Sequence, residues 1–265
     1  MRLINGNELD RYIENVMAKH EIPGVSAVVV DGDEVVYAKG FGYRDSAKRF
    51  PATPETVFGI ASVTKSFTAL AIMQLQEKGK LKLEDPVKKY LPRVNLPGVD
   101  SDSVTIYHFL THTSGLPPIP ALNYSMTANT PGCAGSSIRI DTYDDLIEYL
   151  SGADFQILGA PGKYCSYSND AYALLGAIIA KVSGVPYDRY VWENIFIPLE
   201  MNRSSLGVEQ IHVMDNVSSL YDRDKSGRVF HDPNWQVAPP YLSCGWIKSS
   251  AMDLSRYVRM YIGSG

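Results

Sequence analysis

The chain has 265 residues, of which 45% are hydrophobic and 20% are charged, and its formal net charge at pH 7 is -4. This composition is typical of a globular protein that buries a sizeable core, and it excludes a disordered chain. The 25 Lys and Arg residues form no basic run, and no apolar stretch reaches the roughly 20 residues of a membrane-spanning helix, so we expect neither nucleic acid as a partner nor a membrane span.

The first third of the chain predicts a helix, a β-hairpin and a second, longer helix. Apolar residues at helical spacing predict a helix over Asn7–His20. Two β-rich runs, Gly24–Val30 and Glu34–Tyr43, flank an Asp-Gly-Asp turn and predict an antiparallel hairpin. The apolar pattern of Ser62–Lys78, with Gly79 directly after it, predicts a long and largely buried helix.

The remainder of the chain predicts mostly helices. Pro and Gly separate short helical pieces between residues 86 and 161, including Thr105–Leu110 and Thr142–Leu150. Further helices are predicted over 170–182, 187–196 and 251–262, and a polar, loop-like stretch over 215–238.

These elements predict an α/β fold of the α+β kind, in which an antiparallel sheet flanked by helices is joined to a mainly helical domain. We expect residues 1–85 and 238–265 to form the α/β domain and residues 86–237 to form the helical one.

Ser62 and Lys65 stand three residues apart at the start of a predicted helix, so their side chains share one face. A serine hydroxyl needs a positioned base before it can act as a nucleophile, and Lys65 is the nearest candidate. The helix start also directs the backbone N–H of Ser62, and the positive end of the helix dipole, toward any oxyanion formed there. By itself, however, an S-x-x-K spacing recurs in many unrelated helices where the Lys is simply solvated.

Tyr167 and Asn169 supply the context that this spacing lacks. They lie in a loop directly before an apolar helix, and loops held by rigid elements are where catalytic groups concentrate. Either a neutral Lys65, or a phenolate of Tyr167 beside a charged Lys65, could take the proton from Ser62. The sequence leaves both assignments open.

Ser62-x-x-Lys65 and Tyr167-x-Asn169 together resemble the first two motifs of the serine β-lactamase and penicillin-binding-protein family, which includes class C β-lactamases, D-aminopeptidases, D-Ala-D-Ala carboxypeptidases and esterases. The segment Thr105–Pro117 is also similar to a stretch typical of that family. The resemblance covers essentially the whole chain and implies a β-lactamase/transpeptidase-like fold. It further implies an acyl-enzyme on Ser62, proton transfer by Lys65 and Tyr167, a substrate-binding or Lys65-bracing Asn169, and no cofactor. The implied substrates are short peptides, including D-amino-acid peptides, esters and β-lactams.

The resemblance is incomplete near the C-terminus. The family's third motif, Lys-Thr-Gly or a His-x-Gly equivalent, lies on a strand there and provides the second oxyanion donor, but the sequence ends at Gly265 without it. Lys248-Ser249-Ser250 is only a superficial match. We therefore expect a piece of a longer protein that lacks C-terminal strands and is weakly active or inactive alone, with a homo-oligomer as a further expectation. The alternative is a noncatalytic binding protein that keeps the family's pocket, or an inactive fragment that lacks the third motif.

The histidines, the cysteines and the N-terminal segment predict no further functional site. His112 precedes Thr-Ser-Gly without a G-x-S-x-G elbow nearby, which favours a structural turn, and no His spacing predicts a metal site. Three cysteines in no paired pattern are interpreted as reduced, mostly buried thiols. Residues 1–20 lack the apolar core of a secretory signal, so we expect a cytoplasmic chain as written, or an extracytoplasmic one if a leader was removed.

Overall fold

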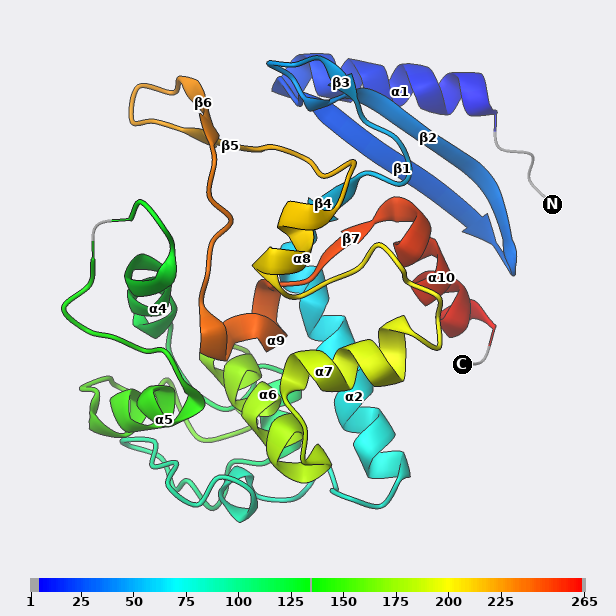
Figure 1. The fold of residues 1–265 in the computed structure, drawn as a ribbon. Helices are drawn as coiled ribbons and strands as arrows, with labels where there is room; N and C mark the ends of the chain where they lie inside the picture. Colours follow the sequence, from blue (N-terminus) through cyan, green and yellow to red (C-terminus); the bar gives the residue numbers. More distant parts are fainter. Residues whose placement is uncertain (1–4, 134, 264–265) are drawn as a thin grey trace. The chain divides into compact units, whose positions relative to one another are not determined.

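The chain divides into two compact units, and Figure 1 labels the helices and strands that form them. The computed structural model describes residues 5–133 and 135–263. We call the unit formed by Met1–Gly59, Phe196–Pro233 and Ile247–Gly265 the sheet unit, and the unit formed by Ile60–Ile195 and Asn234–Trp246 the helical unit. These boundaries differ from those of the predicted domains at residues 60–85, 196–233 and 238–246. The division into an α/β domain and a mainly helical domain stays a prediction.

The sheet unit begins with the predicted helix and hairpin, and the structure confirms both. Helix α1 (Gly6–His20) is followed by the antiparallel strands β1 (Gly24–Asp31) and β2 (Glu34–Asp45), and β3 (Phe50–Pro51) pairs with β2 to give the order β1-β2-β3. Gly32 opens the two-residue loop between β1 and β2 with φ 57, a left-handed conformation that glycine adopts without strain.

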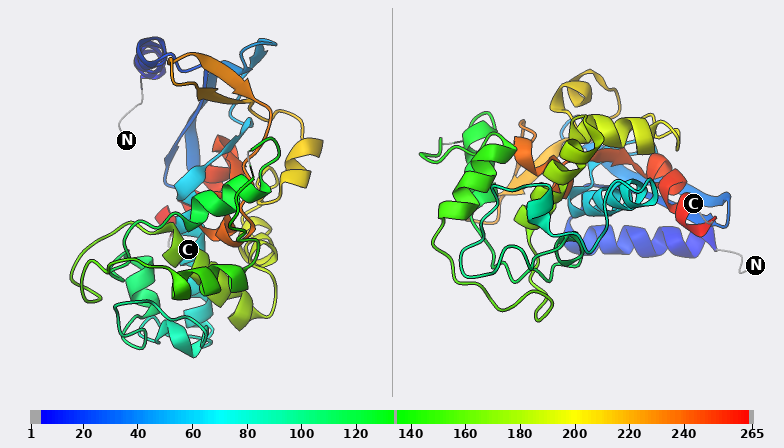
Figure 2. Two further views of the ribbon diagram at one scale, coloured as in Figure 1. Left: turned by 90° about the vertical axis from the view of Figure 1, so that its left-hand side faces the viewer. Right: turned by 90° about the horizontal axis from the view of Figure 1, so that it is seen from below.

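Polar contacts and packing attach helices to this sheet. Asp10 of α1 accepts a hydrogen bond from the hydroxyl of Tyr37 at 2.5 Å and forms an ion pair with Lys39 on β2, and Figure 2 shows α1 lying along the hairpin. Helix α10 (Ala251–Ile262) packs on β1, and its N-cap Ser250 accepts a hydrogen bond from the backbone of Asp253 at 3.1 Å. Helices therefore flank the sheet, as expected for an α+β fold.

Two further antiparallel pairs complete the sheet unit. Strand β4 (Val57–Gly59) pairs with β7 (Lys248–Ser250), and β5 (Leu220–Arg223) pairs with β6 (Val229–Asp232). The β5-β6 hairpin corrects the prediction of a loop over 215–238. These strands are only four residues long and carry charged residues, so the sequence shows no clear alternation of apolar and polar positions.

The helical unit is built around three mutually packed helices, α2 (Thr64–Glu77), α6 (Asn169–Ser183) and α9 (Leu242–Gly245). Ten of the fifteen residues of α6 are buried, which makes it the central element of this unit (Figure 1). Ser168 caps its N-terminus, and Gly184 ends it with φ 80 in the left-handed region.

Shorter elements surround this core. The helical unit also contains η1 (Ala61–Val63), η2 (Val87–Lys89), α3 (Ile106–Leu110), α4 (Ala121–Asn129), α5 (Tyr143–Gly152), α7 (Tyr187–Val191) and η4 (Pro239–Tyr241). The π-helical turn η3 (Trp192–Phe196) continues α7, and α8 (Val208–Val213) belongs to the sheet unit. Among the described residues, no helix is both long and apolar enough to cross a membrane.

The crossing of α6 and α9 requires a glycine, and this gives a stability prediction. A Cβ added to Gly176 would lie 2.4 Å from Oγ of Ser243 and 2.9 Å from the hydroxyl of Tyr143. We expect Gly176→Ala to lower the free energy of unfolding by about 1–3 kcal/mol, because the two helices must separate to accept the methyl group. Urea denaturation of the purified variant would measure this.

Gly152, the last residue of α5, provides the matched control because nothing lies within 4 Å of a Cβ added there. Gly152→Ala should be neutral or stabilising by up to about 1 kcal/mol. Adding Ser243→Gly to Gly176→Ala should recover part of the lost stability. Equal effects of the two alanine substitutions would contradict the close approach.

Candidate active site

Ser62 and Lys65 lie close together at the junction of η1 and α2. Ser62 is the middle residue of the 3-10 turn η1, and Lys65 is the second residue of α2. The predicted helix thus begins two residues later than expected, after a tighter turn. Nζ of Lys65 lies 3.3 Å from Oγ of Ser62, so the structure brings the two predicted side chains into contact.

The backbone directly before Ser62 adopts a strained conformation. Ala61 has φ 44, in the left-handed region that costs an L-residue about 1–2 kcal/mol. Such conformations persist only where the surrounding structure imposes them, and here η1 packs against α9. The turn leaves Ser62 exposed while Lys65 is buried, so the hydroxyl faces solvent and the amine faces the interior.

Oxygen atoms from three elements surround the amine of Lys65. Besides its contact with Ser62, Nζ donates to Oδ1 of Asn169 at 2.8 Å and to the backbone carbonyl of Cys244 at 2.7 Å. It also lies 4.6 Å from the ring centroid of Tyr167 and 5.4 Å from that of Tyr172. Lys65 is only 6% exposed, and a buried cation requires partners of this kind.

Tyr167 completes the cluster from the solvent side. Its hydroxyl donates to Oγ of Ser62 at 2.7 Å, although the residue is 51% exposed. Asn169 is the first residue of α6, and Oγ of the cap residue Ser168 accepts the backbone N–H of Ala171 at 3.0 Å. The structure therefore brings the four residues predicted from the sequence together within the helical unit: Lys65 and Tyr167 contact the Ser62 hydroxyl, and Asn169 contacts Lys65.

The structure adds two groups that sequence reasoning missed. Nδ1 of His112 accepts a hydrogen bond from the backbone N–H of Ser168 at 3.2 Å, and the ring centroids of His112 and Tyr167 lie 4.4 Å apart. The pKa of His112 is lowered by burial and by the positive charge of Lys65. The position of His112 within the family-like segment Thr105–Pro117 was the available signal. The carbonyl of Cys244 gave none, because a backbone acceptor leaves no mark in the sequence.

The three cysteines are free, but the expectation that most are buried was wrong. Cys133 and Cys165 are exposed, and only Cys244 is buried. Burial raises the pKa of the Cys244 thiol to about 12, so this side chain stays protonated and unreactive near neutral pH. Its contribution to the cluster is its backbone carbonyl alone.

The apparent third-motif match, Lys248-Ser249-Ser250, forms β7 in the sheet unit. Lys248 is 2% exposed, and its Nζ donates to the carbonyl of Leu206 at 3.0 Å. Burial lowers the pKa of Lys248 to about 8. Lys248 is therefore held inside the sheet unit by this hydrogen bond, although burial disfavours its charged form.

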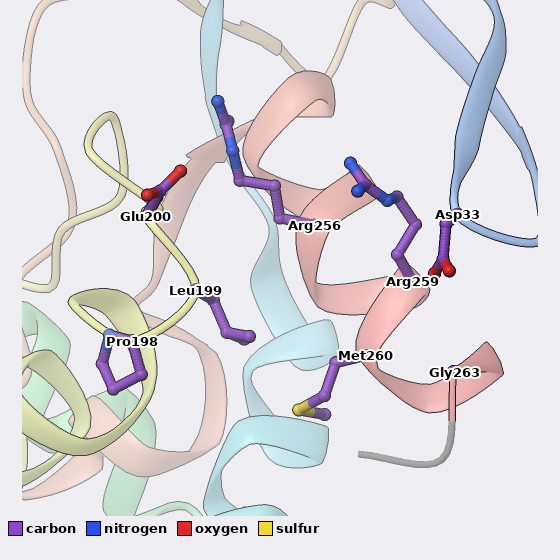
Figure 3. A pocket seen from close by; sticks show the side chains of 8 residues that line it. All are labelled: Asp33, Pro198, Leu199, Glu200, Arg256, Arg259, Met260 and Gly263. Atoms are coloured by element: carbon purple, nitrogen blue, oxygen red, sulfur yellow. The ribbon is translucent and has the colours of Figure 1, made fainter.

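A separate hollow of about 370 Å³ lies beside α10 in the sheet unit (Figure 3). Its lining consists of Asp33, Pro198, Leu199, Glu200, Arg256, Arg259, Met260 and Gly263. Arg256 is already paired with Asp253 at 3.0 Å, and the lining contains no nucleophile. Within residues 5–133 and 135–263, no group of three or more His, Cys, Asp or Glu side chains could hold a metal ion.

Comparison with known proteins identifies the family and the fold of this chain. A model of the family described as Beta-lactamase matches residues 9–265, and the chain belongs to that family. The fold is β-lactamase/transpeptidase-like, with mixed helices and sheets.

Individual relatives agree with this assignment. The chain is 34% identical to Protein flp of Staphylococcus aureus over 98% of its own length and 50% of that protein. It is similar to the octameric penicillin-binding protein homologue from Pyrococcus abyssi, with 38% identity, a TM-score of 0.85, and coverage of 97% of this chain and 56% of that one. A class C β-lactamase gives 28% identity and a TM-score of 0.74 over 95% of this chain and 63% of that one. The chain thus spans about half the length of the curated relatives it matches.

Next to Asn169 lies a buried carboxyl group. Asp170 is 3% exposed, and its Oδ1 accepts a hydrogen bond from the hydroxyl of Tyr241 at 2.7 Å. Burial raises the pKa of Asp170 to about 6, against the opposing effect of the hydrogen bond from Tyr241. Because Tyr241 directly precedes α9, this contact ties the start of α6 to the segment that carries Cys244.

The buried carboxyl group predicts a pH-dependent stability. A pKa raised above its unfolded value of 3.8 means that the folded chain binds the proton more tightly, so the stabilising contribution is complete below about pH 4 and is lost as the pH rises through about 6. Relative to Asp170→Asn, the wild-type chain should lose roughly 2 kcal/mol of unfolding free energy between pH 4 and pH 7. Urea denaturation across this range would test it, and parallel pH curves for the two proteins would contradict it.

Proposed function

We propose that this chain is a serine hydrolase in which Ser62 forms an acyl-enzyme with the carbonyl group of a peptide, an ester or a β-lactam. One observation carries the proposal: Oγ of Ser62 lies 2.7 Å from the hydroxyl of Tyr167 and 3.3 Å from Nζ of Lys65. A nucleophile and its proton-transfer partners must lie within such distances. Membership in the Beta-lactamase family, whose members are generally serine hydrolases, supports the same reaction class.

In this proposal Tyr167 takes the proton from Ser62 while Lys65 stays charged. The oxygens of Asn169 and Cys244 occupy two of the directions around Nζ, and the third faces Ser62. The aromatic rings of Tyr167 and Tyr172 lie near Nζ, where their faces can contact a cation. To accept the Ser62 proton, Tyr167 must act as a phenolate, and its negative charge then lies beside the ammonium group of Lys65.

The covalent steps then follow in order. As the Ser62 oxygen bonds to the substrate carbonyl carbon, its proton passes to Tyr167, and the carbonyl oxygen becomes an oxyanion near the Ser62 backbone N–H and the start of α2. When the intermediate collapses, Tyr167 returns the proton to the leaving group. Water then attacks the acyl-enzyme, Tyr167 takes a proton from the water and passes it to the departing Ser62 oxygen, and the acid is released. Asn169 holds Lys65 and is the proposed contact for the substrate amide.

The class of partner is likewise a proposal. We expect a small molecule or a short peptide in the site, and D-amino-acid peptides are included because the family resemblance implies them. Self-association is supported only by the octameric state of the Pyrococcus abyssi homologue.

Covalent labelling distinguishes the hydrolase from a noncatalytic binder. Incubation with a fluorophosphonate or with a penicillin should add the mass of the phosphonyl or penicilloyl group to the peptide that contains Ser62. Ser62→Ala should abolish the adduct and lower hydrolysis of p-nitrophenyl acetate by at least about 10³-fold. Substrate analogues that bind without any covalent adduct would favour the binding protein instead.

The role of Tyr167 can be separated from a general effect of removing a phenol. Tyr167→Phe should lower kcat by about 10²–10⁴-fold, the range expected for a proton-transfer group. Tyr164, three residues earlier and 60% exposed, offers the control, and Tyr164→Phe should stay within about 3-fold of wild type. Comparable losses in the two variants, measured by steady-state kinetics at equal active-site concentration, would sink the assignment.

A further inference from the structure

The loop that carries Tyr167 is attached to the loop that carries His112. Backbone N–H groups of residues 158–168 donate hydrogen bonds to residues 112–115: Leu158 to the carbonyl of Gly115 (2.9 Å), Gly162 to that of Thr113 (2.8 Å), Ser166 to that of His112 (2.7 Å), and Ser168 to Nδ1 of His112 (3.2 Å). The two hydrogen bonds closest to Tyr167, from Ser166 and Ser168, therefore both end on His112.

His112 contacts three consecutive residues of the second loop. Its carbonyl accepts from Ser166, its ring nitrogen accepts from Ser168, and its ring faces that of Tyr167 at a centroid distance of 4.4 Å and an interplanar angle of 36°. His112 has φ 58, a left-handed conformation in which His is several-fold enriched over most residues. This backbone conformation allows the carbonyl and the ring of one residue to serve the same loop.

Tyr167 needs such a restraint because half of its surface is exposed. A phenol in this position has rotamer freedom that core packing does not remove, and proton transfer requires its oxygen to remain about 3 Å from that of Ser62. The His112 ring is itself held by Tyr172, whose ring centroid lies 5.0 Å away and whose hydroxyl donates to the carbonyl of Leu110 at 2.9 Å. Support for the Tyr167 ring thus extends back to buried α6.

The imidazole stays in the form that this arrangement needs. Nδ1 can accept the Ser168 N–H only while it carries no proton, which places the hydrogen of the neutral ring on Nε2. Burial and the nearby charge of Lys65 both lower the pKa of His112, so the neutral ring persists below the usual titration range.

We infer that His112 is a positioning residue for proton transfer: its ring holds the Tyr167 phenol against Ser62, and its Nδ1 fixes the ring by accepting the Ser168 N–H. The inference rests on the proposed function, in which Tyr167 moves the Ser62 proton. The described contacts of His112 join it to the loop and to the rings around Tyr167, and they do not include Oγ of Ser62. Loss of His112 should therefore lower kcat and leave KM nearly unchanged.

Two substitutions separate the ring from the acceptor. In His112→Asn, the amide oxygen can replace Nδ1, and Asn tolerates φ 58, but the ring against Tyr167 is gone. We expect kcat to fall about 10- to 100-fold, with KM and the melting temperature close to wild type. In His112→Phe the ring remains, while the Ser168 N–H loses its acceptor and φ 58 becomes unfavourable. We expect a melting temperature at least about 4 °C lower but a higher kcat than that of His112→Asn.

Neighbouring Thr113 provides the matched control, because its hydroxyl forms a hydrogen bond with that of Thr111 at 2.8 Å while its backbone carbonyl joins the loops. Thr113→Ala should keep kcat within about 2-fold of wild type. All rates are to be divided by the active-site concentration from covalent labelling, which removes the effect of unfolded protein.

Repeating His112→Asn in a Tyr167→Phe background decides the interpretation. The substitution should have almost no further effect on kcat there, because no phenol oxygen remains to be positioned. An equal loss in both backgrounds, or a kcat for His112→Asn within about 2-fold of wild type, would overturn the inference. If Tyr167→Phe itself leaves kcat unchanged, the proposed function fails first, and that result is distinguishable from a failure of His112 alone.

Discussion

The buried ammonium group of Lys65 is the constraint on which the candidate site depends. A cation that is 6% exposed must be surrounded by oxygen atoms, and those at hydrogen-bond distance come from Ser62, Asn169 and Cys244. These residues lie in η1, α6 and α9, so the charge is satisfied only while three separate elements keep their packing. The requirement to bury one charge thereby fixes the geometry around one hydroxyl.

The two carbonyl partners of Lys65 are also tied to each other. Asn169 opens α6, and the next residue, Asp170, is bonded to Tyr241, which directly precedes the helix that presents Cys244. The close crossing of α6 and α9 at Gly176 adds a second connection between the same two helices. The oxygens that hold the ammonium group are thus set by core packing rather than by mobile side chains, which is what a preorganised site requires.

Local geometry explains which parts of this arrangement could be predicted. The contact of Ser62 with Lys65 follows from their spacing at a helix start, and the exposure of Tyr167 follows from its loop before an apolar helix. The meeting of the two motifs was available only through the family resemblance, because long-range packing leaves no local pattern. The role of the Cys244 carbonyl could not be predicted, because every residue has a backbone carbonyl. The sequence around His112 predicts only a turn, and its contact with the Tyr167 loop becomes visible in the three-dimensional structure.

In the proposed reaction, the different exposure of Ser62, Lys65 and Tyr167 accounts for the different role given to each. Lys65 lies in the interior, where low polarity strengthens its electrostatic effect, whereas Ser62 is exposed and accessible to a carbonyl compound. Tyr167 bridges the two environments, with its ring over the buried amine and its hydroxyl on the exposed oxygen. A proton taken by Tyr167 therefore stays next to the leaving group, while one taken by Lys65 would have to move inward, away from the substrate. The same half-exposed position leaves the Tyr167 ring dependent on an external support, and His112 is the residue that contacts it from the adjoining loop.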